Sequence, residues 1–130
     1  MSTRSQLKPE LVITNGEMSD DIISEVTVIP NISMVSYSYS WDGDTPVGVV
    51  SIQLSNDFKL GPDGSVANAG TWNTATLNYG GSSVTSVPIT GDTGNGLIDI
   101  EATAAYAIRT VYTADSGDGL LNVTIAGKVS

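Results

Sequence analysis

Residues 33–55, SMVSYSYSWDGDTPVGVVSIQLS, decide the fold of this chain. Met34 is followed by residues 35–41, in which large apolar or aromatic side chains alternate with small serines. This period of two places the large side chains on one face of a strand and is typical of half-buried β-structure. Residues 47–55 alternate in the same way, with Val50, Ile52 and Leu54 on one face. Because the short Asp/Gly/Pro segment 42–46 separates the two runs, we expect them to form a β-hairpin.

The same pattern continues on both sides of this segment. Further strands are predicted over residues 21–29, 71–79, 84–89, 97–100, 106–112 and 120–128. Turns rich in Gly and Asp separate them, at residues 61–64, 91–96 and 115–119, and one helical turn is predicted over 101–105. Seven or eight short strands without a long helix predict an all-β fold, an antiparallel β-sandwich, with the jelly roll as one version of it.

The chain has 130 residues, which suits one domain with one core. We expect residues 1–20 to form an N-terminal arm and residues 21–130 to form the β-sandwich domain. The arm has two interpretations: a frayed tail that ends in a short strand, or an extension that reaches a neighbouring subunit. The apolar residues that would make this contact are Leu11, Val12 and Ile13.

Composition excludes several classes of function. The chain has 14 acidic and 5 basic residues, a formal net charge of −9, no histidine and no cysteine. Nucleic acids and anionic membranes are therefore not expected partners, since both attract clustered Lys and Arg. The absence of histidine removes the commonest general base, and the absence of cysteine removes thiolate metal sites. We expect a protein that is not an enzyme.

Two kinds of candidate site remain. The acidic turns could supply oxygen ligands to Ca²⁺, but none of them matches a known calcium loop, and Asp and Gly are favoured in turns for conformational reasons. We therefore expect no cofactor, with Ca²⁺ as the less favoured alternative. Trp41 and Trp72 are candidates for a sugar-stacking platform, against the alternative that the aromatic residues pack the core. Arg109 is expected to pair with Glu101 or Asp99, or to lie in a contact between subunits.

Several phrases of the sequence, taken together, resemble small β-sandwich proteins encoded among the structural genes of bacteriophages. They include W-x-G-x-T-P-V-G at residues 41–48, G-T-W at 70–72 and R-T-V-Y-T at 109–113, and the resemblance covers roughly residues 38–128. The chain departs from the pattern at residues 106–108, where a bulkier aromatic residue would be expected nearer Arg109. The resemblance carries over no catalytic residues.

This resemblance implies a virion component, such as a capsid decoration protein, a vertex or penton protein, or part of a spike. It implies assembly in the host cytoplasm with other virion proteins, such as a major capsid protein, as a homo-oligomer or bound to a lattice. The arm, through Leu11, Val12 and Ile13, would add a strand to a neighbour's sheet edge. The alternative is a carbohydrate-binding or receptor-binding module, because the fold alone does not choose between these functions.

Overall fold

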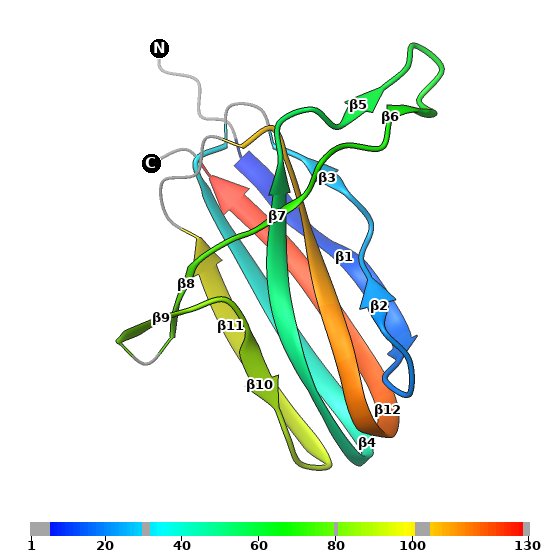
Figure 1. Cartoon of the computed structure of the whole chain (residues 1–130), viewed down its shortest axis with the longest axis vertical. Helices are drawn as coiled ribbons and strands as arrows, with labels where there is room; N and C mark the ends of the chain where they lie inside the picture. Colours follow the sequence, from blue (N-terminus) through cyan, green and yellow to red (C-terminus); the bar gives the residue numbers. More distant parts are fainter. Residues whose placement is uncertain (1–5, 30–31, 80, 101–104, 129–130) are drawn as a thin grey trace.

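The computed structural model describes residues 6–29, 32–79, 81–100 and 105–128. These residues form twelve strands and no helix (Figure 1), so none of them lies in a helix able to span a membrane. The strands are β1 (Gln6–Glu17), β2 (Ile22–Ile23), β3 (Thr27–Val28), β4 (Met34–Ser55), β5 (Lys59–Leu60), β6 (Val66–Asn68), β7 (Asn73–Thr74), β8 (Leu77–Tyr79), β9 (Ser82–Val84), β10 (Val87–Ile89), β11 (Thr93–Ile100) and β12 (Ala107–Lys128). Eight of them belong to one antiparallel sheet, while β5 pairs with β6 and β8 with β9.

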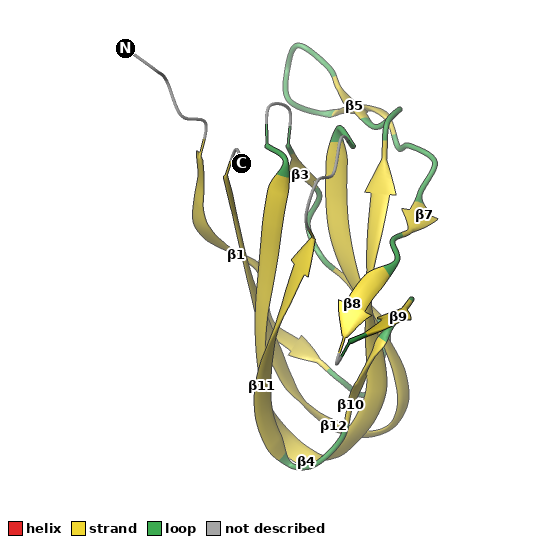
Figure 2. Ribbon diagram, turned by 90° about the vertical axis from the view of Figure 1, so that its left-hand side faces the viewer, coloured by secondary structure: helices red, strands yellow, loops and turns green. Residues whose placement is uncertain are grey.

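Two 22-residue strands, β4 and β12, organise the molecule. They pair antiparallel along their whole length, from Met34 opposite Lys128 to Ser55 opposite Ala107. Figures 1 and 2 show that both strands bend back at the same end of the molecule, which folds the ribbon into two layers. The all-β antiparallel sandwich predicted from the sequence is therefore confirmed.

Each layer contains one half of the folded ribbon. In the first layer, β1 pairs with the carboxy-terminal half of β12, and β11 pairs with the amino-terminal half of β4. In the second layer, β2 and β3 pair with the other half of β12, while β10 and β7 pair with the other half of β4. The first layer thus has the strand order β1–β12–β4–β11, with β1 and β11 at its edges.

The predicted hairpin over residues 33–55 is wrong. Residues 42–46 form a corner inside the continuous strand β4, and the two flanking halves pair with other strands. Gly43 and Gly119 face each other at this corner so closely that a Cβ on Gly43 would lie 2.3 Å from the Gly119 Cα. Gly117 has φ of 78° there, and Thr45 has φ of 44°. A corner and a hairpin turn need the same residue types, which explains the error.

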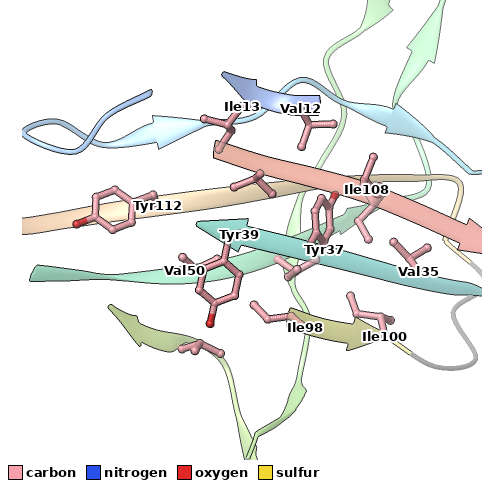
Figure 3. Close-up of a cluster of buried hydrophobic side chains, with 14 of the residues drawn as sticks. Val12, Ile13, Val35, Tyr37, Tyr39, Val50, Ile98, Ile100, Ile108 and Tyr112 are labelled. Carbon is pink, nitrogen blue, oxygen red and sulfur yellow. The ribbon is translucent and has the colours of Figure 1, made fainter. Parts of the chain in front are cut away.

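The core lies between the layers and is built from the alternating positions (Figure 3). Val35, Tyr37 and Tyr39 are buried on the inner face of β4, as the alternation predicts, and Val50 and Ile52 are buried after the corner. β11 contributes Ile98 and Ile100. β12 contributes Ile108 and Tyr112 in the second layer and Leu121, Val123 and Ile125 in the first. Burying each large aliphatic side chain contributes about 1.5–3 kcal/mol, so this shared core holds the two layers together.

The expected division of the chain at residue 20 does not match the structure. Residues 6–17 form β1, an edge strand of the first layer, instead of an arm outside the sandwich. Val12 and Ile13 are buried in the core, as is Met18 just after the strand. Residues 1–5 lie outside the described residues, as do residues 101–104 of the predicted helical turn.

Candidate interaction surface

The outer face of the first layer is covered by small polar side chains. We call this surface the serine face, because the serines that alternate with the buried aromatic residues of β4 run along its centre. Its residues are Ser36, Ser38 and Ser40 of β4, Asn122, Thr124 and Ala126 of β12, and Asn95, Leu97 and Asp99 of β11. The sequence alternation that marks the core on one side of β4 therefore defines this surface on the other.

Strand register arranges the serine face in rows across the sheet. Leu97 lies opposite Ser38, Ser38 opposite Thr124, and Thr124 opposite Leu11 on β1. Leu97 and Leu11 are 59% and 51% exposed, so a leucine stands at each edge of a strip of hydroxyl groups.

An amide pair lies beside this row. The Asn15 backbone N–H donates to the Asn122 Oδ1 (2.9 Å), and the Asn122 Nδ2 donates to the Asn15 Oδ1 (3.2 Å). These bonds hold the amide of Asn122 at the rim of the face, next to β1.

Two shallow depressions of about 400 Å³ lie along the serine face. The first is lined mainly by Ser38, Ser40, Asn95, Leu97, Asn122 and Thr124. The second lies at the end of the layer and includes Asp99 and Lys128, side chains of opposite charge. Hydroxyl and amide groups of this kind bind a flat protein surface or a polar ligand through hydrogen bonds.

Trp41 lies on the inner face of β4 and packs partly against the core. Its ring stacks on Tyr39, with ring centroids 6.0 Å apart and an interplanar angle of 12°. The indole N–H donates to the Gly91 carbonyl oxygen at 3.0 Å. The ring also covers Gly94, directly opposite on β11, where a Cβ would lie 2.4 Å from it. The contacts of Trp41 therefore lie within its own layer and hold its ring in place.

Trp72 lies on the other layer, on the outer face that carries Arg109. The Arg109 guanidinium lies 4.2 Å from the centroid of the Trp72 ring, and the Phe58 ring lies 6.0 Å from it. The Trp72 N–H donates to the Ala69 carbonyl oxygen at 2.9 Å. Because Trp41 faces the core of one layer and Trp72 the outside of the other, the structure does not bring them into one platform.

Arg109 has different neighbours from those expected. Its Nε donates to the Gln53 Oε1 at 2.7 Å, and its guanidinium stacks on Trp72. Partial burial by these neighbours lowers the pKa of Arg109. Asp99 belongs to the first layer, and Glu101 is outside the described residues. The aromatic partner was missed because it arrives from a loop, and strand alternation gives no sign of it.

Two carboxylates of the acidic turns, those of Asp57 and Asp92, accept hydrogen bonds from other parts of the chain. Asp57 accepts hydrogen bonds from the Thr71 N–H (2.6 Å), the Thr71 hydroxyl (3.0 Å) and the Ser55 hydroxyl (2.9 Å). These bonds, led by the Thr71 backbone N–H, lower the pKa of Asp57. Asp92 accepts from the Thr45 N–H at 2.9 Å. Among the described residues, no three acidic side chains gather into a group that could hold a metal ion.

The three predicted assembly residues are divided between core and surface. Val12 and Ile13 are 6% and 5% exposed and pack in the core (Figure 3). Leu11 is 51% exposed. A register shift between Leu11 and Ile13 lets two consecutive residues point inward. Contact of Val12 and Ile13 with a neighbouring subunit would require β1 to leave its own sheet.

Comparison with known proteins adds information about the fold. No protein-family model matches the chain, and no curated protein matches its sequence. Among solved structures, the SPBc2 prophage-derived protein YomS has a similar fold, with a TM-score of 0.53 over 97% of this chain and 96% of that chain. The two sequences are 8% identical, so the likeness concerns the fold alone. The chain is thus an all-β sandwich protein whose fold also occurs in a prophage-derived protein.

Proposed function

We propose that this chain is a non-enzymatic structural protein of a bacteriophage particle, located in the virion. It binds other virion proteins, such as a major capsid protein, as a decoration, vertex or spike component. The observation that carries the proposal is the fold shared with a prophage-derived protein over nearly the full length of both chains. The sequence phrases at residues 41–48, 70–72 and 109–113 support the same assignment separately.

The surface of the sandwich suits this role. The serine face offers hydroxyl and amide groups on a nearly regular sheet, flanked by exposed leucines. Such a surface can contact a folded protein over a broad area without a deep pocket. The net charge of −9 argues for a protein partner over packaged nucleic acid.

The test is incorporation into particles. Particles released from cells that carry the gene are purified on a density gradient, and the chain is quantified by mass spectrometry against the major capsid protein. A constant ratio across the particle peak is expected, at a copy number set by the particle's symmetry. Recovery of the chain only in the soluble fraction of the lysate would overturn the proposal.

The carbohydrate-binding alternative receives no support from the tryptophan positions, and a glycan array with the purified chain tests it. We expect no binding that depends on Trp41 or Trp72. A glycan bound by the wild type and lost in Trp72→Ala would replace the structural proposal with the binding-module one.

A deletion of residues 1–14 is unsuitable for testing assembly, because it would remove Val12 and Ile13 from the core.

A further inference from the structure

Most edges of the described sheet carry features that discourage pairing with another chain. In β1, Pro9 and Lys8 interrupt the edge, and the register with β12 shifts at three places. The edge strands of the second layer, β2, β3, β7 and β10, are only two or three residues long. Proline, lysine, bulges and short strands are the usual devices that keep a sheet edge from accepting a further strand.

β11 lacks all of these devices. Its eight residues pair with β4 in unbroken register, from Thr93 opposite Asp42 to Ile100 opposite Val35. It contains neither proline nor lysine, and within the described residues its only strand partner is β4. Figure 2 looks onto this side of the molecule and shows the β8–β9 hairpin beside β11. β8 comes close to β11, but neither strand of this hairpin pairs with it.

We propose that β11 pairs with β11 of a second copy of this chain, antiparallel about a two-fold axis at Leu97. A continuous sheet keeps the serine faces of both copies on one side, so only registers that pair outward residues with outward residues are allowed. The two-fold axis must therefore pass through a residue position and not between two positions.

The sequence of β11 is self-complementary in the register centred on Leu97. On the outer side, Leu97 meets Leu97 of the second copy, and the Asn95 amide meets the Asp99 carboxylate. On the inner side, Gly96 meets Ile98 and Gly94 meets Ile100, so each large side chain faces a glycine. Leu97, 59% exposed in the single chain, would become covered by its counterpart.

The neighbouring allowed registers fit less well. Centring the axis on Gly96 places Leu97 against Asn95 and leaves Ile100 without an opposing residue of β11. Centring it on Ile98 places Leu97 against the carboxylate of Asp99. Only the axis at Leu97 pairs apolar with apolar and amide with carboxylate, which is the side-chain matching that stabilises antiparallel pairs.

This inference deepens the proposed function and rests on it for its biological role, since a two-fold pair would present two serine faces to the particle. The pairing itself is a property of the purified chain. Because each copy carries a net charge of −9, the pair should associate more strongly as added salt screens the repulsion.

A single cysteine tests the pairing and the register together, because the chain contains none. Opposing residues of antiparallel strands have Cβ atoms about 4.5–5.5 Å apart, close to the separation in a disulfide. Leu97→Cys is therefore expected to form a covalent dimer under mild oxidation. Leu120→Cys, an exposed leucine of the same face but on β12, is the matched control and should stay monomeric.

Analytical ultracentrifugation of the wild type over a concentration series should show a monomer–dimer equilibrium that Leu97→Lys abolishes and Leu120→Lys leaves unchanged. Asn95→Asp places two carboxylates opposite each other and should raise the dissociation constant by about tenfold. Adding Asp99→Asn to that variant restores the amide–carboxylate pair and should restore the wild-type constant.

A monomeric wild type without Leu97→Cys cross-linking would overturn this pairing, as would a dimer that survives Leu97→Lys. Neither result bears on particle incorporation, which the density-gradient experiment measures separately. Conversely, absence from particles would refute the virion role and leave the solution dimer intact.

Discussion

Two tyrosine hydroxyls, those of Tyr37 and Tyr112, are buried without a hydrogen-bond partner among the described residues. A buried polar group without a partner carries a desolvation cost that its ring burial must offset. Burial also raises the pKa of Tyr37 far above its ordinary value. The phenol rings fill the core between the layers (Figure 3), so the rings contribute packing and the hydroxyls contribute no hydrogen bond.

Replacement of Tyr37 by Phe should stabilise the protein by about 1 kcal/mol, because it removes the unpaired hydroxyl and keeps the ring. Urea denaturation followed by circular dichroism measures the change. Tyr106→Phe is the control, since Tyr106 is 40% exposed, and it should alter stability by less than about 0.5 kcal/mol. A loss of stability in Tyr37→Phe would mean that its hydroxyl is hydrogen-bonded after all.

Asp57 should make the segment of residues 56–71, which contains the paired strands β5 and β6, sensitive to acid. Its pKa is lowered in the folded chain from the ordinary 3.8, so its stabilising contribution is present above that pH and lost as the pH falls below it. The amide of Thr71, which donates to Asp57, should shift in NMR spectra with a midpoint below 3.8. Asp57→Asn should remove this titration, whereas Asp118→Asn, at the corner, should leave it. A midpoint at or above 3.8 would contradict the hydrogen bonding described.

At the scale of the element, β11 and β1 both differ from what their sequences first indicate. Residues 91–96 read as a turn because they contain three glycines, yet β11 already begins at Thr93. Gly94 and Gly96 lie opposite Trp41 and Tyr39, whose rings occupy the space that Cβ atoms would fill. Glycine in a strand opposite an aromatic ring is a recognised cross-strand arrangement, and only the register reveals it.

In β1, adjacent residues should respond very differently to truncation. Ile13→Ala should cost about 2–5 kcal/mol, because it leaves a cavity in the core. Leu11→Ala should cost less than about 0.5 kcal/mol, since its side chain is 51% exposed. Thermal or urea unfolding of both variants measures the difference. Equal effects would show that β1 does not dock on the core as described.

At the scale of the whole molecule, we expect the two layers to unfold together. β4 and β12 each run through both layers, so loss of one layer would remove half of each shared strand and expose the common core. A chain of this construction is expected to unfold in one cooperative step. It is also expected to fold slowly for its size, because strands distant in sequence must pair first.

The two tryptophans report on the two layers independently, Trp41 on the first and Trp72 on the second. In Trp72→Phe the fluorescence comes from Trp41, and in Trp41→Phe it comes from Trp72. For each variant, the fluorescence midpoint in urea should coincide with its midpoint by circular dichroism. Separate midpoints within one variant would show that the layers unfold one after the other.

The sequence by itself determined that this is an all-β chain, because alternation of large and small side chains depends only on the two-residue period of a strand. It also indicated which face of residues 34–41 is buried. It could not distinguish a corner from a hairpin at residues 42–46, or a strand of the sandwich from an arm at residues 6–17. These outcomes depend on which distant segment supplies the hydrogen-bonding partner.

The candidate surface was likewise predictable from the sequence only in part. The serines of β4 were visible as the outward half of an alternating pattern, but their neighbours on β11 and β12 were not. The tertiary structure decided that Leu97, Ser38, Thr124 and Leu11 form one row, and that the long, regular β11 lies at an edge. Local sequence sets the face on which a side chain lies, whereas strand order and register are set by pairing between segments far apart in the chain.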